Sequence, residues 1–535
     1  MKKIILFPIY LFLICFSAIL FTQQSAQAEI ELYDGKLLLK GFVKEVAYYR
    51  TSMTSRDKYY HDNNLAFLQT SALLEALYTV RDDDDMTIRL FAGLKGYWQK
   101  AQYFDDEINR SLSPRIRKSW AYPNSFYDDI LTEAYTTIEK GPFELRLGKQ
   151  IVVWGSLDLA QVTDVVNPPD FRRGYPGINT WEEIKQGAFM IRAFYQSELP
   201  GDLLFEVIFN PGDYKEIKLA HEATWPGTSP WGVRNGGAGN KDTKIGIYEW
   251  NREKWTRDAP GWNTSNWEGG FRIRGFTYGI DWTFIYWNSI QDDPIADATK
   301  MTNLTNPPIS DVNRWVLNYR GRSANGEDVS PYWNEYGTLY KYKRYEMIGG
   351  TFERYSPEIW DTVWIIEWAL DFGHPINKGT DGNDQAPIGN TERNIFDIGI
   401  KMQKALNIPW FTQSNIACGR MLDFAITYQW DKVLSHEGRS DAVGPRWHQN
   451  TDSVADNITL YFKQDMFYNK IVLVFIGNYY FQIGRWQAIP SVGYSLPGVH
   501  WRIEGGYAMY GGKHDKYINY SSHNDAAFMR IRYEF

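Results

Sequence analysis

The sequence predicts an all-β protein, a transmembrane antiparallel β-barrel of about eighteen strands with short periplasmic turns and long extracellular loops. Three observations lead to this prediction. The chain begins with an export signal and has no later apolar run long enough for a membrane helix. Aromatic residues make up 16% of its 535 residues. Its last ten residues alternate between apolar and polar side chains.

The N-terminus has the order of a secretory signal peptide. Two lysines precede an apolar run at residues 4–21, and the small residues Ala26-Gln27-Ala28 follow as a cleavage site. We therefore expect a signal peptide over residues 1–28 and a single outer-membrane β-barrel domain over residues 29–535. Cleavage would remove both lysines and lower the formal net charge of −7 by two. An acidic exported protein has no electrostatic basis for binding nucleic acid.

Composition indicates how the chain would cross a membrane. Beyond the signal, no stretch approaches the roughly 18 to 20 consecutive apolar residues of a transmembrane helix. The chain instead holds 22 Trp and 36 Tyr, and aromatic side chains gather where a barrel wall crosses the membrane interfaces. Because lipid excludes open sheet edges, such a chain can span a bilayer only as a closed barrel. The scattered histidines and the single cysteine of the mature chain, Cys418, predict no disulfide, metal site or cofactor.

The C-terminal residues 526–535 alternate with a period of two. One face carries Ala527, Met529, Ile531, Tyr533 and Phe535, and the other carries Arg530, Arg532 and Glu534. A terminal Phe with apolar residues at every second position before it resembles the C-terminal signal of outer-membrane barrels. We expect the apolar face to contact the lipid of a Gram-negative outer membrane.

The same alternation places charged residues on the inside of other strands. The predicted lumen-lining residues are Glu144, Arg146, Arg272, Arg274, Asp423, Arg502, Glu504, Arg530 and Arg532. A soluble sandwich would have to bury this charged face, whereas a barrel of about 16 to 18 strands encloses an aqueous channel. The pattern therefore indicates a water-filled pore.

The candidate strands and their connections follow the pattern of a transmembrane barrel. The strands are expected at residues 36–50, 65–80, 85–100, 129–140, 142–154, 186–196, 201–210, 268–276, 278–289, 343–355, 358–371, 392–404, 417–431, 455–467, 470–483, 487–495, 499–511 and 525–535. Every second connection is short, as at Gly141 and Asn469, and most of the others are long, as at 211–267 and 290–342. An even number of strands leaves both termini on the periplasmic side.

The most distinctive motif is Glu144-Leu-Arg-Leu-Gly-Lys-Gln-Ile-Val-Val-Trp-Gly155, followed by Thr163-Asp-Val-Val-Asn-Pro-Pro-Asp170. Here the chain resembles the proteobacterial outer-membrane family called domain of unknown function 1302, which has a Gly-Lys/Arg-Gln strand, a Trp-Gly pair and an Asp-Val-Val-Asn-Pro turn. Residues 345–354 and 357–373, with Trp360, Glu367 and Gly373, are similar to later strands of that family. The resemblance spans essentially the whole mature chain and implies a porin-like barrel. Members are often encoded beside efflux-type transporters and genes for degrading hydrophobic compounds, so it also implies apolar solutes and an efflux-type transport system as a partner.

The residues of this motif also predict a constriction. The strand is expected to end near Trp154, whose indole suits a membrane interface, and the prolines of Asn167-Pro-Pro-Asp170 stiffen the loop that follows. A stiff polar loop at this point of a porin-like barrel typically folds inward. The residues expected to line the constriction and bind solute are Trp154, Asp158, Asp164, Asn167, Asp170, Arg172 and Arg173. The alternative is an ordinary outer loop stiffened by its prolines.

The leading hypothesis for function is a porin-like channel, not an enzyme, through which small solutes diffuse, including hydrophobic or amphipathic compounds. Its predicted partners are outer-membrane lipids and a small-molecule solute. One alternative is an outer-membrane hydrolase of the lipase or protease type, with Ser435-His436 or Ser522-His523 as nucleophile and base. The other is a structural or adhesion barrel with a closed lumen.

Overall fold

Alternating apolar and polar side chains let a strand contact lipid with one face and the barrel interior with the other, and this alternation builds the whole wall. The structure is a computed structural model, which describes residues 29–51, 65–100, 123, 125–157, 162–170, 181–218, 261–292, 295–296, 340–378, 389–437, 453–482, 484–496, 499–512 and 525–535. Within the described part of the chain, no helix is long and apolar enough to cross a membrane.

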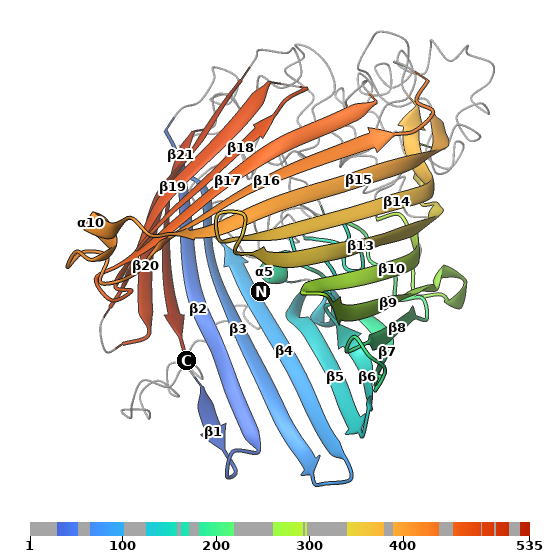
Figure 1. Cartoon of the computed structure of the whole chain (residues 1–535). Coiled ribbons are helices and arrows are strands. Elements are labelled where there is room, and N and C mark those ends of the chain that lie inside the picture. The colour runs from blue at the N-terminus through green and yellow to red at the C-terminus, as the bar shows by residue number, and fades with distance from the viewer. Residues whose placement is uncertain are drawn as a thin grey trace, which may run out of the picture.

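Eighteen strands form the wall (Figure 1). They are β2 (Leu37–Arg50), β3 (Leu65–Asp82), β4 (Thr87–Gln99), β5 (Leu131–Lys140), β6 (Phe143–Gln150), β7 (Ala188–Gln196), β8 (Leu204–Asn210), β9 (Glu268–Thr277), β10 (Ile280–Ile290), β13 (Arg344–Ser356), β14 (Thr362–Lys378), β15 (Gly389–Leu406), β16 (Leu422–Val433), β17 (Val454–Met466), β18 (Ile471–Tyr480), β19 (Arg485–Ser495), β20 (Trp501–Gly512) and β21 (Ala526–Glu534). Each pairs antiparallel with the next, and β21 pairs with β2, where Phe42 lies opposite Glu534. The sheet is therefore closed, and the predicted antiparallel barrel is confirmed.

A few short elements accompany the wall. Strand β1 (Ile30–Leu32) pairs with the start of β2, and β11 (Ile295–Ala296) pairs with β12 (Tyr340–Lys341) as a separate two-stranded sheet. In the residues that the structure describes, the helical elements are the π-helix η2 (Phe126–Ile130), α5 (Trp181–Ile184), the 3-10 helix η3 (Thr264–Asn266) and α10 (Pro409–Thr412).

Several strand ends differ from the predicted ones. The strand predicted at 142–154 ends at Gln150, because the chain turns away from the sheet there. Strand β14 continues to Lys378 rather than ending at residue 371, across an irregularity between Asp371 and His374. Strand β16 begins at Leu422 rather than at residue 417, because α10 and the turns after it occupy the preceding residues.

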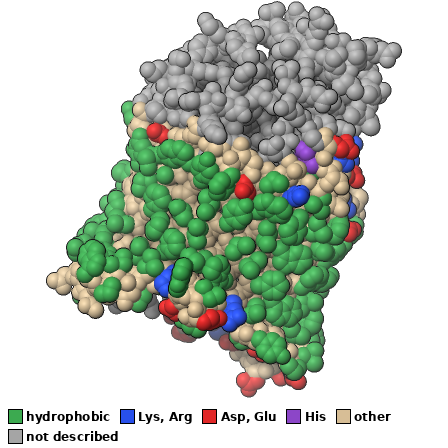
Figure 2. All heavy atoms as spheres, turned by 45° about the horizontal axis from the view of Figure 1, so that its top comes forward, with side chains coloured by type: hydrophobic (Ala, Val, Ile, Leu, Met, Phe, Trp, Pro, Cys, Tyr) green, Lys and Arg blue, Asp and Glu red, His purple; other side chains and the backbone are tan. Residues whose placement is uncertain are grey.

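The outer and inner faces of the wall have different chemistry. On β21, Met529 is 50% exposed while its neighbour Phe528 is 5% exposed, so the predicted alternation holds at the C-terminus. Figure 2 shows hydrophobic side chains covering a broad band of the wall, with few charged side chains inside that band. Such a band is the surface that a barrel presents to lipid. The chain has the porin-like fold of an outer-membrane barrel.

Candidate functional site

The segment that follows β6 turns into the barrel interior. Gly148 prepares this turn near the end of β6: its φ is +133°, and a Cβ there would lie 2.2 Å from the carbonyl oxygen of Ala134, so only glycine fits. Beyond Gln150 the described residues 151–157, 162–170 and 181–187, here called the inward segment, are largely buried. Figure 1 shows its short helix α5 near the middle of the barrel.

Polar side chains hold the two ends of the inward segment together. Oδ1 of Asn167 accepts a hydrogen bond from the backbone N–H of Val152 at 2.6 Å. Nδ2 of Asn167 donates to the backbone oxygens of Gln150 at 3.3 Å and of Gln186 at 2.7 Å. The backbone N–H of Asp170 donates to the carbonyl of Ile184 at 2.6 Å. The sequence Asn-Pro-Pro-Asp therefore acts as a brace between the outgoing and returning chain.

A single carboxylate of β14 fastens the inward segment to the wall. Glu367 of β14 is 0% exposed. It accepts hydrogen bonds from the backbone N–H groups of Ser156, Leu157 (2.8 Å) and Thr163 (3.3 Å), and from the hydroxyl of Thr163 (3.1 Å). A buried carboxylate is tolerated when its oxygens are hydrogen-bonded in this way. The contact joins residues more than 200 positions apart, since Leu157 and Glu367 are separated by 210.

Glycine makes room for the segment beside this carboxylate. A Cβ on Gly399 of β15 would lie 2.3 Å from Cδ1 of Leu157 and 3.3 Å from Cγ2 of Val162. The missing side chain leaves a notch in the inner wall that Leu157 fills.

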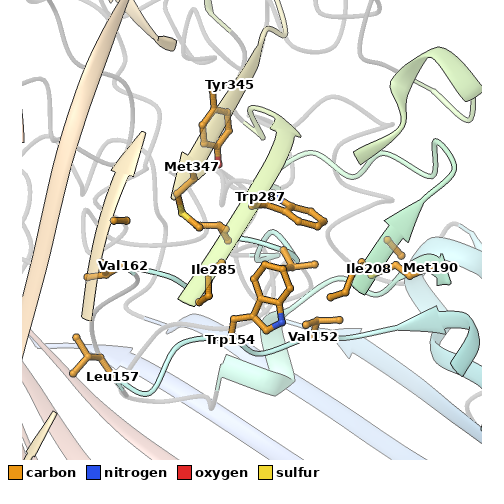
Figure 3. Close-up of a cluster of buried hydrophobic side chains, with 14 of the residues drawn as sticks. Val152, Trp154, Leu157, Val162, Met190, Ile208, Ile285, Trp287, Tyr345 and Met347 are labelled. Atoms are coloured by element: carbon orange, nitrogen blue, oxygen red, sulfur yellow. The ribbon is translucent and has the colours of Figure 1, made fainter. Parts of the chain in front are cut away.

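Apolar packing completes the attachment (Figure 3). Residues of the segment pack against inward-facing residues of β7, β8, β10, β13 and β14; the cluster contains Val152, Trp154, Leu157, Val162, Val165, Val166, Ala188, Met190, Ile208, Ile285, Trp287, Tyr345, Met347, Ile365 and Ala369. The rings of Trp154 and Trp287 meet edge to face, with their centroids 5.4 Å apart. This arrangement is favourable for two aromatic rings.

The structure corrects the expected position of Trp154. A membrane-interface position was predicted, but Trp154 is 2% exposed and lies inside the barrel. Its Nε1 donates to Glu206 of β8 at 3.3 Å. The prediction was wrong because the strand ends four residues earlier, at Gln150, so Trp154 belongs to the inward segment and not to the wall.

Glu206 is also the centre of a buried ion-pair cluster. Its side chain is 1% exposed and lies between Arg192 of β7 at 2.5 Å and Arg272 of β9 at 2.8 Å. One carboxylate thus pairs with two guanidinium groups from the neighbouring strands, and the indole of Trp154 caps it.

The inward segment reaches a second part of the wall through Glu183 of α5. This carboxylate pairs with Lys44 of β2 at 2.8 Å and with Arg532 of β21 at 3.4 Å. Lys95 of β4 donates to the backbone oxygen of Glu183. The inward segment therefore contacts two separate parts of the inner wall, β14 through Glu367 and strands β2, β4 and β21 through Glu183.

The residues predicted to form the constriction fall into two groups. Trp154, Asp164, Asn167 and Asp170 belong to the inward segment, where Asp164 pairs with the buried Lys185. Their side chains shape the segment in this structure, and contact with a solute stays a prediction. Asp158, Arg172 and Arg173 lie outside the described residues.

The predicted lumen-lining residues of β20 and β21 alternate with the exposed apolar residues Trp501, Ile503 and Met529, and lining of a lumen stays a prediction for the whole set. Several occur as ion pairs: Glu144 with Arg146, Arg272 with Glu206, Arg274 with Asp281, Arg502 and Arg530 with Glu504, and Arg532 with Glu183. Asp423 of β16 lies opposite Lys463 of β17 in the register. Of the serine–histidine pairs, Ser435-His436 directly follows β16, and Ser522-His523 is outside the described residues.

Sequence reasoning did not assign roles to Glu183, Glu206, Lys44 and Gly399. Glu206 had a visible signal, since it is the one carboxylate of β8 and interrupts a run of apolar residues. Glu367, noted only within the family resemblance, similarly interrupts the apolar run at residues 363–370 of β14. A charge that interrupts an apolar strand on its inner face needs a partner from elsewhere in the chain.

The chain is similar to a described protein family and to several solved structures. The model of the family described as "Protein of unknown function (DUF1302)" matches residues 55–535. The chain is similar to the structure of Salmonella typhi OmpF in complex with daunomycin, with 12% identity, 95% of this chain and 100% of that chain covered, and a TM-score of 0.41. It is similar to Acinetobacter baumannii OccAB3 (8% identity, 93% and 99% covered, TM-score 0.44) and to Pseudomonas aeruginosa OpdK with vanillate (9% identity, 94% and 98% covered, TM-score 0.44). No curated protein matches the sequence.

Proposed function

This chain belongs to the family described as "Protein of unknown function (DUF1302)", and we propose that it is an outer-membrane channel through which small solutes diffuse past the inward segment. Hydrophobic and amphipathic compounds are among the proposed solutes. The proposal rests mainly on charged side chains of the inner wall that are accessible to water. Arg530, in the middle of β21, keeps 21% of its side chain exposed inside a closed barrel, and Arg532 and Arg502, nearer the strand ends, keep 29% and 42%. A dry, packed lumen would not leave a guanidinium group so accessible.

The inward segment is the proposed constriction. It is fastened to β14 by Glu367 and braced by Asn167, so it is held in place across the interior rather than left at the barrel mouth. Weak contacts on such a segment would select solutes while letting them leave again. The proposal includes no catalytic step. Lipids of the outer membrane would contact the apolar wall, signal cleavage before Glu29 would precede insertion, and an efflux-type transport system is the proposed periplasmic partner.

The test is single-channel conductance of the refolded mature protein in a planar bilayer. Wild-type protein is expected to conduct steadily. The variant Glu367→Ala removes the acceptor for the segment's N–H groups, so we expect a larger or more variable conductance. The matched control is Glu358→Ala, which removes an exposed carboxylate at the turn before β14 that pairs only with a surface arginine in the described contacts.

The outcomes separate the candidate functions. No conductance from a folded, heat-modifiable barrel would overturn the channel and favour a closed structural barrel. Hydrolysis of phospholipid or peptide substrates that is lost in His436→Ala would favour the hydrolase. Conductance that is equal in wild type and Glu367→Ala would retain the channel and reject the segment as its constriction.

A further inference from the structure

Three cations lie side by side on the inner wall where the barrel closes. In the register of the sheet, Lys44 of β2 lies opposite Arg532 of β21, and Arg532 lies opposite Arg502 of β20. We call these three residues the cation row. Like charges directly opposite each other destabilise a sheet, so the row has a cost that the barrel itself does not require.

The same strands become apolar farther along their inward faces. On β2 the next inward residues are Val46 and Tyr48, and on β21 Arg530 is followed by Phe528. These residues belong to an apolar cluster of the inner wall that comprises Val46, Tyr48, Phe67, Ile489, Ala508, Tyr510, Ala526 and Phe528. The inward residues therefore change from charged to apolar two residues beyond the cation row on β2, four residues beyond it on β21 and six residues beyond it on β20, or roughly 7 to 20 Å along the strands.

A carboxylate already lies on the cation row. Glu183 of the inward segment pairs with both Lys44 and Arg532, and Glu534 pairs with Nε of Arg532 at 2.8 Å. Among the described residues of this region, the five cations Lys44, Lys95, Arg502, Arg530 and Arg532 outnumber the side-chain carboxylates Glu183, Glu504 and Glu534. This excess occurs in a chain whose formal net charge is −7.

Water reaches the arginines of this region. The side chains of Arg502, Arg530 and Arg532 are 42%, 21% and 29% exposed, whereas Lys44 is 3% exposed beneath Glu183. An anion entering the lumen can therefore meet the guanidinium groups directly, and guanidinium pairs with carboxylate through charge-assisted hydrogen bonds.

We propose that the cation row binds the head group of an amphipathic anion, a carboxylate carried on an apolar body, and that Glu183 occupies the head-group position when no solute is bound. The proposal rests on the channel function above and names its solute class. The solute carboxylate replaces the Glu183 carboxylate on Lys44 and Arg532. Val46, Tyr48 and Phe528 are 4%, 2% and 5% exposed, so the apolar body of the solute reaches them only when side chains of this cluster move apart. Displaced Glu183 loosens the contact between α5 and the wall, so solute entry and constriction opening are linked.

The experiment measures ion selectivity and solute block in planar bilayers. Phenylbutyrate is the amphipathic anion, phenylbutylammonium is the cation of matched size, and acetate carries the charge without the apolar body. We expect an anion-selective wild-type channel whose conductance responds to phenylbutyrate at a lower concentration than to acetate or phenylbutylammonium. In Lys44→Met and Arg532→Gln the half-saturating concentration of phenylbutyrate should rise about tenfold, which corresponds to about 1.4 kcal/mol of binding free energy.

The variant Glu183→Gln should change the half-saturating concentration of phenylbutyrate in the opposite direction. Removing the competing carboxylate should lower the half-saturating concentration of phenylbutyrate and increase anion selectivity. Arg354→Gln is the control, since Arg354 pairs with Glu358 at an exposed turn and should change neither quantity. Heat-modifiable electrophoretic mobility establishes that each variant is folded. A purely structural role for the Glu183 contacts would shift Glu183→Gln and Arg532→Gln in the same direction, and that result would overturn the proposal.

The remaining outcomes distinguish this proposal from the channel. Steady conductance with equal responses to phenylbutyrate and phenylbutylammonium would keep the channel and reject the anion site. If the folded barrel does not conduct, calorimetry of phenylbutyrate with protein in lipid nanodiscs decides. Binding that is weakened by Arg532→Gln would support the site without the channel, and absence of binding would overturn both.

Discussion

Charged side chains have different surroundings on the two sides of the barrel interior. On the side of β6 to β15, Glu367 and Glu206 are buried, and each is surrounded by donors that satisfy it. On the side of β20, β21 and β2, the cation row places like charges next to each other and leaves its arginines partly exposed. The first side is built like a protein core, and the second is not.

This difference indicates which charges hold the structure and which are available to a solute. A buried charge with complete partners is costly to disturb, because removing one partner leaves the other uncompensated. Adjacent like charges in a wet wall reduce stability, and such local conflicts are expected at functional sites. Variants on the two sides should therefore differ in kind: large losses of stability on the first, and changes of selectivity on the second.

The largest effect is expected for Glu206→Gln. The substitution leaves the guanidinium groups of Arg192 and Arg272 without a carboxylate in a region where Arg192 is 10% exposed. Loss of one partner of a buried ion pair costs about 3 to 5 kcal/mol. Urea unfolding of the refolded protein in lipid vesicles, followed by tryptophan fluorescence, measures this free energy. A loss below about 1 kcal/mol, the value for a solvated pair, would mean that water reaches this cluster and that the two sides do not differ.

A smaller loss in the free energy of unfolding is expected from a substitution at Gly399, which the inward segment contacts. In Gly399→Ala the added Cβ would overlap Leu157, and overpacking of this kind costs about 1 to 3 kcal/mol. The partner variant Leu157→Ala removes the overlapping atoms, so the double variant should be less destabilised than the sum of the single ones. A double-mutant cycle in the same unfolding assay measures this coupling. If the losses of the two single variants simply add in the double variant, Leu157 does not pack against Gly399.

The sequence was sufficient for the wall and insufficient for what lies inside it. All of the candidate strands correspond to strands of the barrel, because period-two alternation is a local signal that the membrane enforces on every strand. The contacts of the inward segment are not local. Glu183 lies 139 residues from Lys44 and 349 from Arg532, and no pattern within either strand names its partner.

Trp154 shows how a sound local rule fails for the same reason. A tryptophan near the end of a membrane strand suits the interface, but the contacts that carry it inward come from Trp287 and Glu206, which are distant in sequence. The sequence signal for these contacts was a single glutamate in each of two strands, Glu206 in β8 and Glu367 in β14. Each indicated that an unknown partner must reach the inner wall, although neither could identify that partner.

The smallest effect on stability, and the sharpest contrast with Glu206, is expected for Arg502→Gln. Glu504 keeps Arg530 as a partner at 2.7 Å when Arg502 is removed, so no buried charge is left uncompensated. The substitution also relieves the repulsion between Arg502 and Arg532, so the free energy of unfolding should stay within about 0.5 kcal/mol of wild type or rise slightly. Anion selectivity, measured as the reversal potential in a salt gradient, should nevertheless fall. If Arg502→Gln instead destabilises the barrel as much as Glu206→Gln does, the arginines of the cation row are structural partners, and the contrast between the two sides of the interior is lost.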